Sequence, residues 1–196
     1  MTRVVRAREL IAKPVVTLAG DDLAEVRDVV YDSERGELLG FTLNKRSWFG
    51  GKLRERLTAD AVHAIGKDAV MVESDDALVD AAAAPEPVAN ATPERNVIGA
   101  SVLTESGTRV GDVTDVIVAL GTGARAVGYE VTGGQPGDAT ARYVPLPEQR
   151  AVSGDALIVP DEVDRFVVDD LAGFGASVPE FRAQLHEDAR GESDAR

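Results

Sequence analysis

The sequence contains no cysteine, which excludes disulfides, thiolate nucleophiles and Cys-ligated zinc or iron–sulfur centres. Its two histidines, His63 and His186, lie in different segments and in no recognisable metal-binding motif, so we expect no metal and no cofactor. No apolar run approaches the roughly 18 residues of a membrane span. The N-terminal MTRVVRAREL also lacks the apolar core of a secretory signal. These absences favour a cytoplasmic protein.

Positive charge is also scarce. The chain has 21 lysine and arginine residues against 34 aspartate and glutamate residues, which gives a net charge of -13. A molecule this acidic repels free polyanions at long range, so DNA is not expected as a partner. With 44% hydrophobic and 28% charged residues, the composition is typical of a globular protein.

One phrase of the sequence occurs twice. LAEVRDVVYD, from residue 23, and VGDVTDVIVA, from residue 110, superpose with Asp28 on Asp115, an offset of 87 residues. The second copy then has one extra residue, so that Gly40 matches Gly128, and GKDAVMV and SGDALIV close the two copies alike. Because an internal repeat marks a repeated structural unit, we predict two equivalent domains.

The domain boundaries follow from the ends of the repeat. We predict a first domain over residues 1–80, a linker over 81–95, a second domain over 96–168 and a C-terminal helical tail over 169–196. The linker, AAAAPEPVANATPER, has the small residues and prolines typical of inter-domain segments. Each domain is near the lower size limit for an independent core, so we expect the domains to pack on each other or on a second chain. The alternative is two independent domains on a flexible linker.

The repeated segments predict strands. LAEVRDVV alone is ambiguous, because Leu23, Val26 and Val30 have a helical spacing. The second copy decides between the two, since VGDVTDVIVAL carries the β-branched run 116–118, which suits a strand. Short apolar segments separated by turns predict a mainly β fold, with a small barrel or sandwich for each copy. The side chains expected in the two cores are Val29, Val70, Val116 and Leu157.

Short helices are predicted beside the strands. We expect a single helical turn within ADAVHAIG, residues 59–66, and within the matching PEQRAVSG of the second copy. Residues 74–84 are expected to be helical with Ser74 as N-cap, and residues 162–174 with Gly173 as the stop. A last helix is expected in SVPEFRAQLHEDAR, with its serine as N-cap and its proline at an early position.

Each copy resembles a PRC-barrel domain, the small β-barrel named after the cytoplasmic part of the photosynthetic reaction centre H subunit and also found in a ribosome maturation factor. In the first copy the resemblance rests on LAEVRDVVYDSERGELLGFTL and RLTADAVHAIGKDAVMVES. In the second it rests on VGDVTDVIVALGTGARAVGYEV and ARYVPLPEQRAVSGDALIVP. The resemblance implies two tandem PRC-type β-barrels and a non-catalytic fold that binds other macromolecules. Neither the hydrophobic helix of the reaction-centre subunit nor the partner barrel of the maturation factor is seen, so neither specific role is transferred.

No motif predicts an enzyme. The sequence shows no nucleophile elbow, no catalytic-triad order and no Walker loop. GTGARA, residues 121–126, matches G-x-G-x-x-A, but a dinucleotide loop requires a helix next and RAVGYEV is typical of a strand. The acidic residues Asp21, Asp22, Glu25 and Asp28 lack the spacing of an EF-hand and are interpreted as a solvated turn.

The two copies differ most where the first carries NKRSWFGGKLRERL, residues 44–57, and the second carries TGGQPGDATARYV. Residues 45–56 hold five basic side chains and one glutamate, a net charge of +4 that leaves -17 for the rest of the chain. This segment also holds the only tryptophan. The candidate partner-binding residues are Lys45, Arg46, Trp48, Phe49, Lys52, Arg54 and Arg56.

Two interpretations of this segment remain open. Trp48 and Phe49 either anchor a partner from the tip of a hairpin or plug the open end of their own barrel. We predict a non-catalytic binding or scaffolding module that mediates protein–protein interaction or self-association into a homo-oligomer. The alternative is a peripheral membrane-surface or RNA-associated protein acting through residues 44–57. Charge-driven binding to lipid or RNA would fall steeply with added salt, which separates the two.

Overall fold

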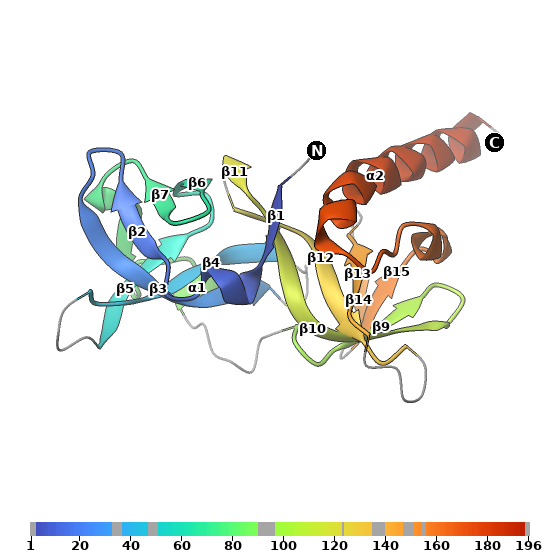
Figure 1. Cartoon of the computed structure of the whole chain (residues 1–196), viewed down its shortest axis with the longest axis horizontal. Coiled ribbons are helices and arrows are strands. Elements are labelled where there is room, and N and C mark those ends of the chain that lie inside the picture. The colour runs from blue at the N-terminus through green and yellow to red at the C-terminus, as the bar shows by residue number, and fades with distance from the viewer. Residues whose placement is uncertain are drawn as a thin grey trace. The chain divides into compact units, whose positions relative to one another are not determined.

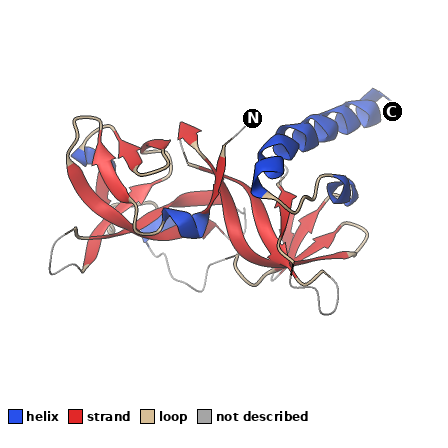
Figure 2. Ribbon diagram, in the orientation of Figure 1, coloured by secondary structure: helices blue, strands red, loops and turns tan. Residues whose placement is uncertain are grey.

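The computed structural model of the chain describes residues 3–32, 37–46, 51–89, 97–122, 124–134, 140–146, 151–153 and 156–194 (Figure 1). The chain is mainly β, with one long helix near its C-terminal end (Figure 2). It divides into two compact units, which we describe separately. The N-terminal unit comprises Val5–Val97 and Val118–Ala126, and the C-terminal unit comprises Met1–Val4, Ile98–Ile117 and Val127–Arg196.

The first sheet has eight strands in the order β11-β6-β7-β2-β3-β4-β5-β8. Their bounds are β2 (Pro14–Thr17), β3 (Asp22–Asp32), β4 (Glu37–Asn44), β5 (Lys52–Thr58), β6 (Val62–Ile65), β7 (Val70–Val72), β8 (Leu78–Asp80) and β11 (Gly121–Thr122). β2 runs parallel to β7, and all other neighbours are antiparallel. The short helical elements beside this sheet are the 3-10 helices η1 (Ala7–Leu10) and η2 (Asp75–Ala77) and the helix α1 (Glu86–Ala89).

The second sheet has seven strands, six of them in the order β13-β12-β10-β9-β15-β14, with β1 (Val4–Arg6) pairing with β10. The bounds of the six are β9 (Ser101–Thr104), β10 (Arg109–Ala119), β12 (Arg125–Thr132), β13 (Arg142–Pro145), β14 (Ala151–Ser153) and β15 (Ala156–Val159). β9 runs parallel to β15. The 3-10 helix η4 (Asp161–Arg165) and the helix α2 (Leu171–Asp194) follow the last strand.

The two sheets share one strand order, which confirms the predicted repeat. The order β5-β4-β3-β2-β7-β6 in the first sheet corresponds strand by strand to β13-β12-β10-β9-β15-β14 in the second. β3 and β10, which contain the repeated phrase, are both 11-residue strands related by the 87-residue offset. In both strands an aspartate Oδ1 accepts a hydrogen bond from the next backbone N–H, Asp28 from Val29 and Asp115 from Val116, each at 2.8 Å. The recurring aspartates therefore have a structural role.

The cores follow the period-two pattern of the strands. In β2 every second residue is buried, Val15 and Thr17, and the matching residues of β9 are Val102 and Thr104. Large side chains that are almost fully buried fill the first core at Phe41, Leu43 and Leu57 and the second at Ile117 and Tyr129. The core positions expected from the sequence, Val29, Val70, Val116 and Leu157, are all buried.

The prediction of a helical turn in residues 59–66 is wrong. Residues Val62–Ile65 form β6, which pairs with β7 through Val62 opposite Val72 and Ile65 opposite Val70. In the matching segment of the second copy, Ala151–Ser153 form β14, and residues 147–150 and 154–155 lie outside the described part of the chain. Pairing with a neighbouring strand satisfies the backbone groups that a helical turn would have bonded locally.

The helix predicted for residues 74–84 is also wrong, because only Asp75–Ala77 form a 3-10 turn before the chain enters β8. Ser74 makes no side-chain cap hydrogen bond. The second copy has the same arrangement: η4 is followed by an antiparallel bridge from Val168 to Tyr143 of β13. In both copies, this segment therefore adds a strand or bridge to the sheet, where local spacing had favoured a helix.

Asp170 explains where the C-terminal helix begins. Its Oδ1 accepts a hydrogen bond from the N–H of Gly173 at 2.7 Å, the contact that an N-cap residue makes with the third residue of a helix. Gly173 therefore lies in the first turn of α2 and does not end a helix, which corrects the prediction. Ser177 and Pro179 lie inside the same helix and do not start a new one. The predicted C-terminal helical extension itself is confirmed.

Candidate partner-binding site

The predicted basic segment connects β4 and β5, two neighbouring antiparallel strands. Asn44 lies opposite Lys52, and the backbone N–H of Lys45 donates a hydrogen bond to the carbonyl of Gly51 at 2.8 Å. The connection between these strands therefore begins at Lys45 and ends at Gly51. Trp48 and Phe49 lie outside the described residues, so their two interpretations stay open.

Four of the five basic side chains are exposed, and three of them, Lys45, Lys52 and Arg54, have no partner among the described residues. Lys45 stands at the end of β4, and Lys52 and Arg54 lie on one face of β5, where residues alternate between the two faces. Within the described part of the chain, none of the three forms an ion pair or a side-chain hydrogen bond. These three cations are free to meet an anionic group on another molecule.

The other two basic side chains are held by the barrel itself. Arg46 forms an ion pair with Asp22, with 3.1 Å between Nη1 and Oδ2. Nη1 of Arg56 donates to the carbonyl oxygens of Leu53, Arg54 and Glu55 at 3.3, 3.2 and 3.1 Å. The sequence predicted all five as partner-binding residues, and the geometry assigns Arg46 a contact with β3 and Arg56 contacts within β5.

Thr42 lies in β4 opposite Arg56 and is only 7% exposed. Its Oγ1 is buried and makes no hydrogen bond with any described residue, a situation that costs about 1–3 kcal/mol. We expect Thr42→Val, which keeps the shape, to raise the free energy of unfolding by about 1 kcal/mol in urea denaturation. Thr17→Val is the control, because the Thr17 hydroxyl accepts a hydrogen bond from the N–H of Asp21 at 3.0 Å, and it should destabilise. Equal effects of the two substitutions would contradict this explanation.

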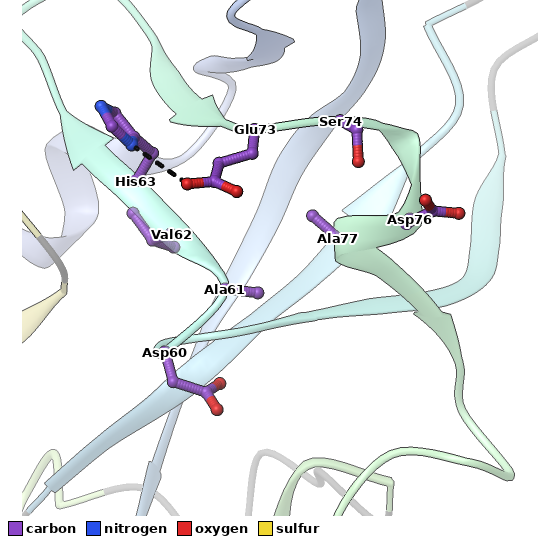
Figure 3. A pocket seen from close by; sticks show the side chains of 8 residues that line it. All are labelled: Asp60, Ala61, Val62, His63, Glu73, Ser74, Asp76 and Ala77. Carbon is purple, nitrogen blue, oxygen red and sulfur yellow. Dashed lines mark ion pairs between the residues drawn. The ribbon is translucent and has the colours of Figure 1, made fainter.

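A second feature of the N-terminal unit was not anticipated from the sequence. A cavity of about 490 Å³ opens beyond the end of β5. Figure 3 shows its lining: residues 60–63 on one side and residues 73, 74, 76 and 77 on the other, with Glu73 turned toward His63. His63 Nδ1 and Glu73 Oε1 are 4.0 Å apart, and both side chains are exposed, at 44% and 82%. The lining residues are Asp60, Ala61, Val62, His63, Glu73, Ser74, Asp76 and Ala77.

The cavity is an anionic surface. Its lining includes three exposed acidic residues, Asp60, Glu73 and Asp76. No group of three or more histidine, aspartate or glutamate side chains among the described residues is arranged to hold a metal ion. No sequence pattern indicates this cavity, because its acidic residues come from segments that only the pairing of β6 with β7 brings together.

The glycine-containing stretch from Gly121 was interpreted as a hairpin turn followed by a strand, and only the strand is confirmed. Gly121–Thr122 form the short strand β11, and the strand β12 begins at Arg125, while Gly123 lies outside the described residues. A dinucleotide loop would require a helix at this point, and a strand follows instead. In the described part of the chain, no helix is both long enough and apolar enough to cross a membrane.

The family model for the PRC-barrel domain matches the chain twice, over residues 3–81 and 94–174. The chain belongs to the PRC-barrel family. The two matches coincide with the two copies of the repeat, so the chain is a tandem PRC-barrel protein, as the sequence resemblance implied. The basic hairpin and the acidic cavity both lie in its first PRC-barrel domain. A search of curated proteins finds no match to the chain.

Proposed function

We propose that this tandem PRC-barrel protein is a non-catalytic binding module in the cytoplasm that docks an acidic protein surface through its β4–β5 hairpin. The PRC-barrel fold is compatible with a non-catalytic role. The observation that carries the proposal is the exposure of Lys45, Lys52 and Arg54 without a carboxylate partner among the described residues. In a chain of net charge -13, three such cations on one hairpin form a local inversion of charge.

A protein surface suits this hairpin better than a polyanion does. Charges interact over a screening length of about 8 Å at physiological ionic strength, so three cations can pair with nearby carboxylates. A nucleic acid or an anionic membrane is an extended charged surface, and it would also meet the acidic remainder of the molecule. Short-range pairing with a few carboxylates avoids that repulsion.

Reversing two of the free cations tests the proposal. We expect Lys52→Glu with Arg54→Glu to reduce affinity capture of the partner from native lysate at least tenfold, because like charges then face each other across the interface. The control is Lys67→Glu with Arg125→Glu, which makes the same change in net charge at two exposed residues elsewhere. Circular dichroism should show both variants folded. Undiminished capture by the hairpin variant would reject the hairpin as the binding site.

The alternative function, binding to a membrane surface or to RNA, is supported by the tryptophan and phenylalanine next to the basic residues. It is tested by cosedimentation with vesicles containing anionic lipid and by titration of a labelled single-stranded oligoribonucleotide. Binding that falls steeply with added salt and is lost in the hairpin variant would favour this alternative. If neither probe binds, an acidic protein partner remains the explanation for the exposed basic side chains of the hairpin.

A further inference from the structure

We propose that the hairpin docks on a second copy of this chain, in the acidic cavity of that copy's first PRC-barrel domain. This inference rests on the proposed function and names its partner. The occupant is suggested by charge complementarity within one sequence: three free cations lie on the hairpin, and three exposed carboxylates lie around the cavity.

The cavity has the size and the chemistry to receive these side chains. Its volume of about 490 Å³ is in the range of small-molecule sites, which are roughly 300–1,000 Å³, and exceeds the space that one arginine side chain needs. Asp60 and Asp76 form no ion pair with any described residue, and Glu73 meets only His63, at 4.0 Å. A guanidinium group can bind a carboxylate through two parallel hydrogen bonds, so Arg54 is the best matched of the three cations.

A molecule cannot make this contact with itself. Lys52 and Arg54 lie at the start of β5, and the cavity begins at Asp60, just beyond the end of that strand. At about 3.3 Å per residue, the stretch of β5 from Arg54 to its end at Thr58 spans roughly 13 Å, more than one arginine side chain can bridge. A second copy is therefore required. Because the two surfaces differ, two copies can exchange the contact reciprocally in a two-fold dimer, or the contact can repeat from chain to chain in a ring or an open assembly.

The experiment is a charge swap, read by light scattering on the full chain from micromolar to millimolar concentration at low salt. We expect the wild-type mass to rise above the 20.7 kDa of one chain as concentration increases, and to return toward it as salt is added. Lys52→Glu with Arg54→Glu should be monomeric, and so should Glu73→Arg with Asp76→Arg. The variant with all four substitutions has the net charge of the wild type and should associate again.

Three results would overturn the inference. The wild type could stay at 20.7 kDa at every concentration, both double variants could still associate, or the variant with all four substitutions could stay monomeric. Lys67→Glu with Arg125→Glu is again the control and should associate as the wild type does. The capture experiment separates this inference from the proposed function. If the hairpin variant loses a captured protein while the charge swap restores nothing, the hairpin binds a different protein and only the second copy is rejected.

Discussion

Gly40→Ala is expected to lower the free energy of unfolding by roughly 3 kcal/mol or more. A Cβ at Gly40 would lie 2.2 Å from the carbonyl oxygen of Leu57 and 3.0 Å from the Cα of Thr58, and both are backbone atoms of β5. The residue also has a φ of +156°, which side chains disfavour. Relief would require β5 to move away from β4, and the pairing that holds the basic hairpin would then be broken.

Chemical denaturation measures this effect, with Gly51→Ala as the matched control. Gly51 ends the connection between the same two strands, and a Cβ there would meet nothing within 4 Å. The control should leave the denaturation midpoint nearly unchanged. If Gly40→Ala shifted the midpoint no more than Gly51→Ala does, the close approach of β4 and β5 would not be a requirement of the fold.

Phe174→Ala is expected to cost about 3–5 kcal/mol of stability, the usual loss for a fully buried phenylalanine. Phe174 is 0% exposed, and its ring centroid lies 6.0 Å from that of Tyr143 in β13. A Cβ on Gly128 of β12 would lie 2.2 Å from the ring, so the absence of a side chain at Gly128 makes the space that the ring occupies. Phe174 thus fixes the first turns of α2 on the sheet.

Hydrogen exchange distinguishes detachment of the helix from a general loss of stability. Relative to the wild type, Phe174→Ala should accelerate hydrogen exchange of the α2 amides more than that of the β10 amides. Leu185→Ala, further along the same helix at a partly exposed residue, is the control and should change stability far less. Equal losses for Phe174→Ala and Leu185→Ala would mean that Phe174 is not the main contact of the helix.

The sequence correctly predicted the strands that carry the repeated phrase, because the two copies could be compared. The strand at residue 23 could be told from a helix only because the second copy carries β-branched residues at 116–118. The errors lie where local spacing favoured a helix in both copies. Residues 74–84 looked helical locally, yet Leu78 pairs with Leu57, just as Val168 bridges to Tyr143 in the second copy. Local spacing contains no information about such a partner in a distant strand.

The sequence predicted where the candidate site lies in the chain, but not which of its side chains have partners. The basic residues of 45–56 located the hairpin from composition alone. The sequence could not show that Arg46 pairs with Asp22, because Arg46 follows β4 and Asp22 begins β3, and only the pairing of these strands brings the two residues together. The acidic cavity could not be predicted from the sequence for the same reason, since Asp60 and Glu73 come to line one cavity only when β6 and β7 pair.

The strand β11 makes the boundary between the repeats different from the boundary between the compact units. Gly121 pairs with Ile65 and Thr122 with Ala64, so the outer edge of β6 is covered by residues that belong to the second copy of the repeat. A chain cut at the linker would separate β6 from that cover and leave a bare edge, which is a template for pairing with other chains. The first repeat on its own thus lacks one strand of its sheet. A fragment designed on the boundary of the repeat would divide one compact unit.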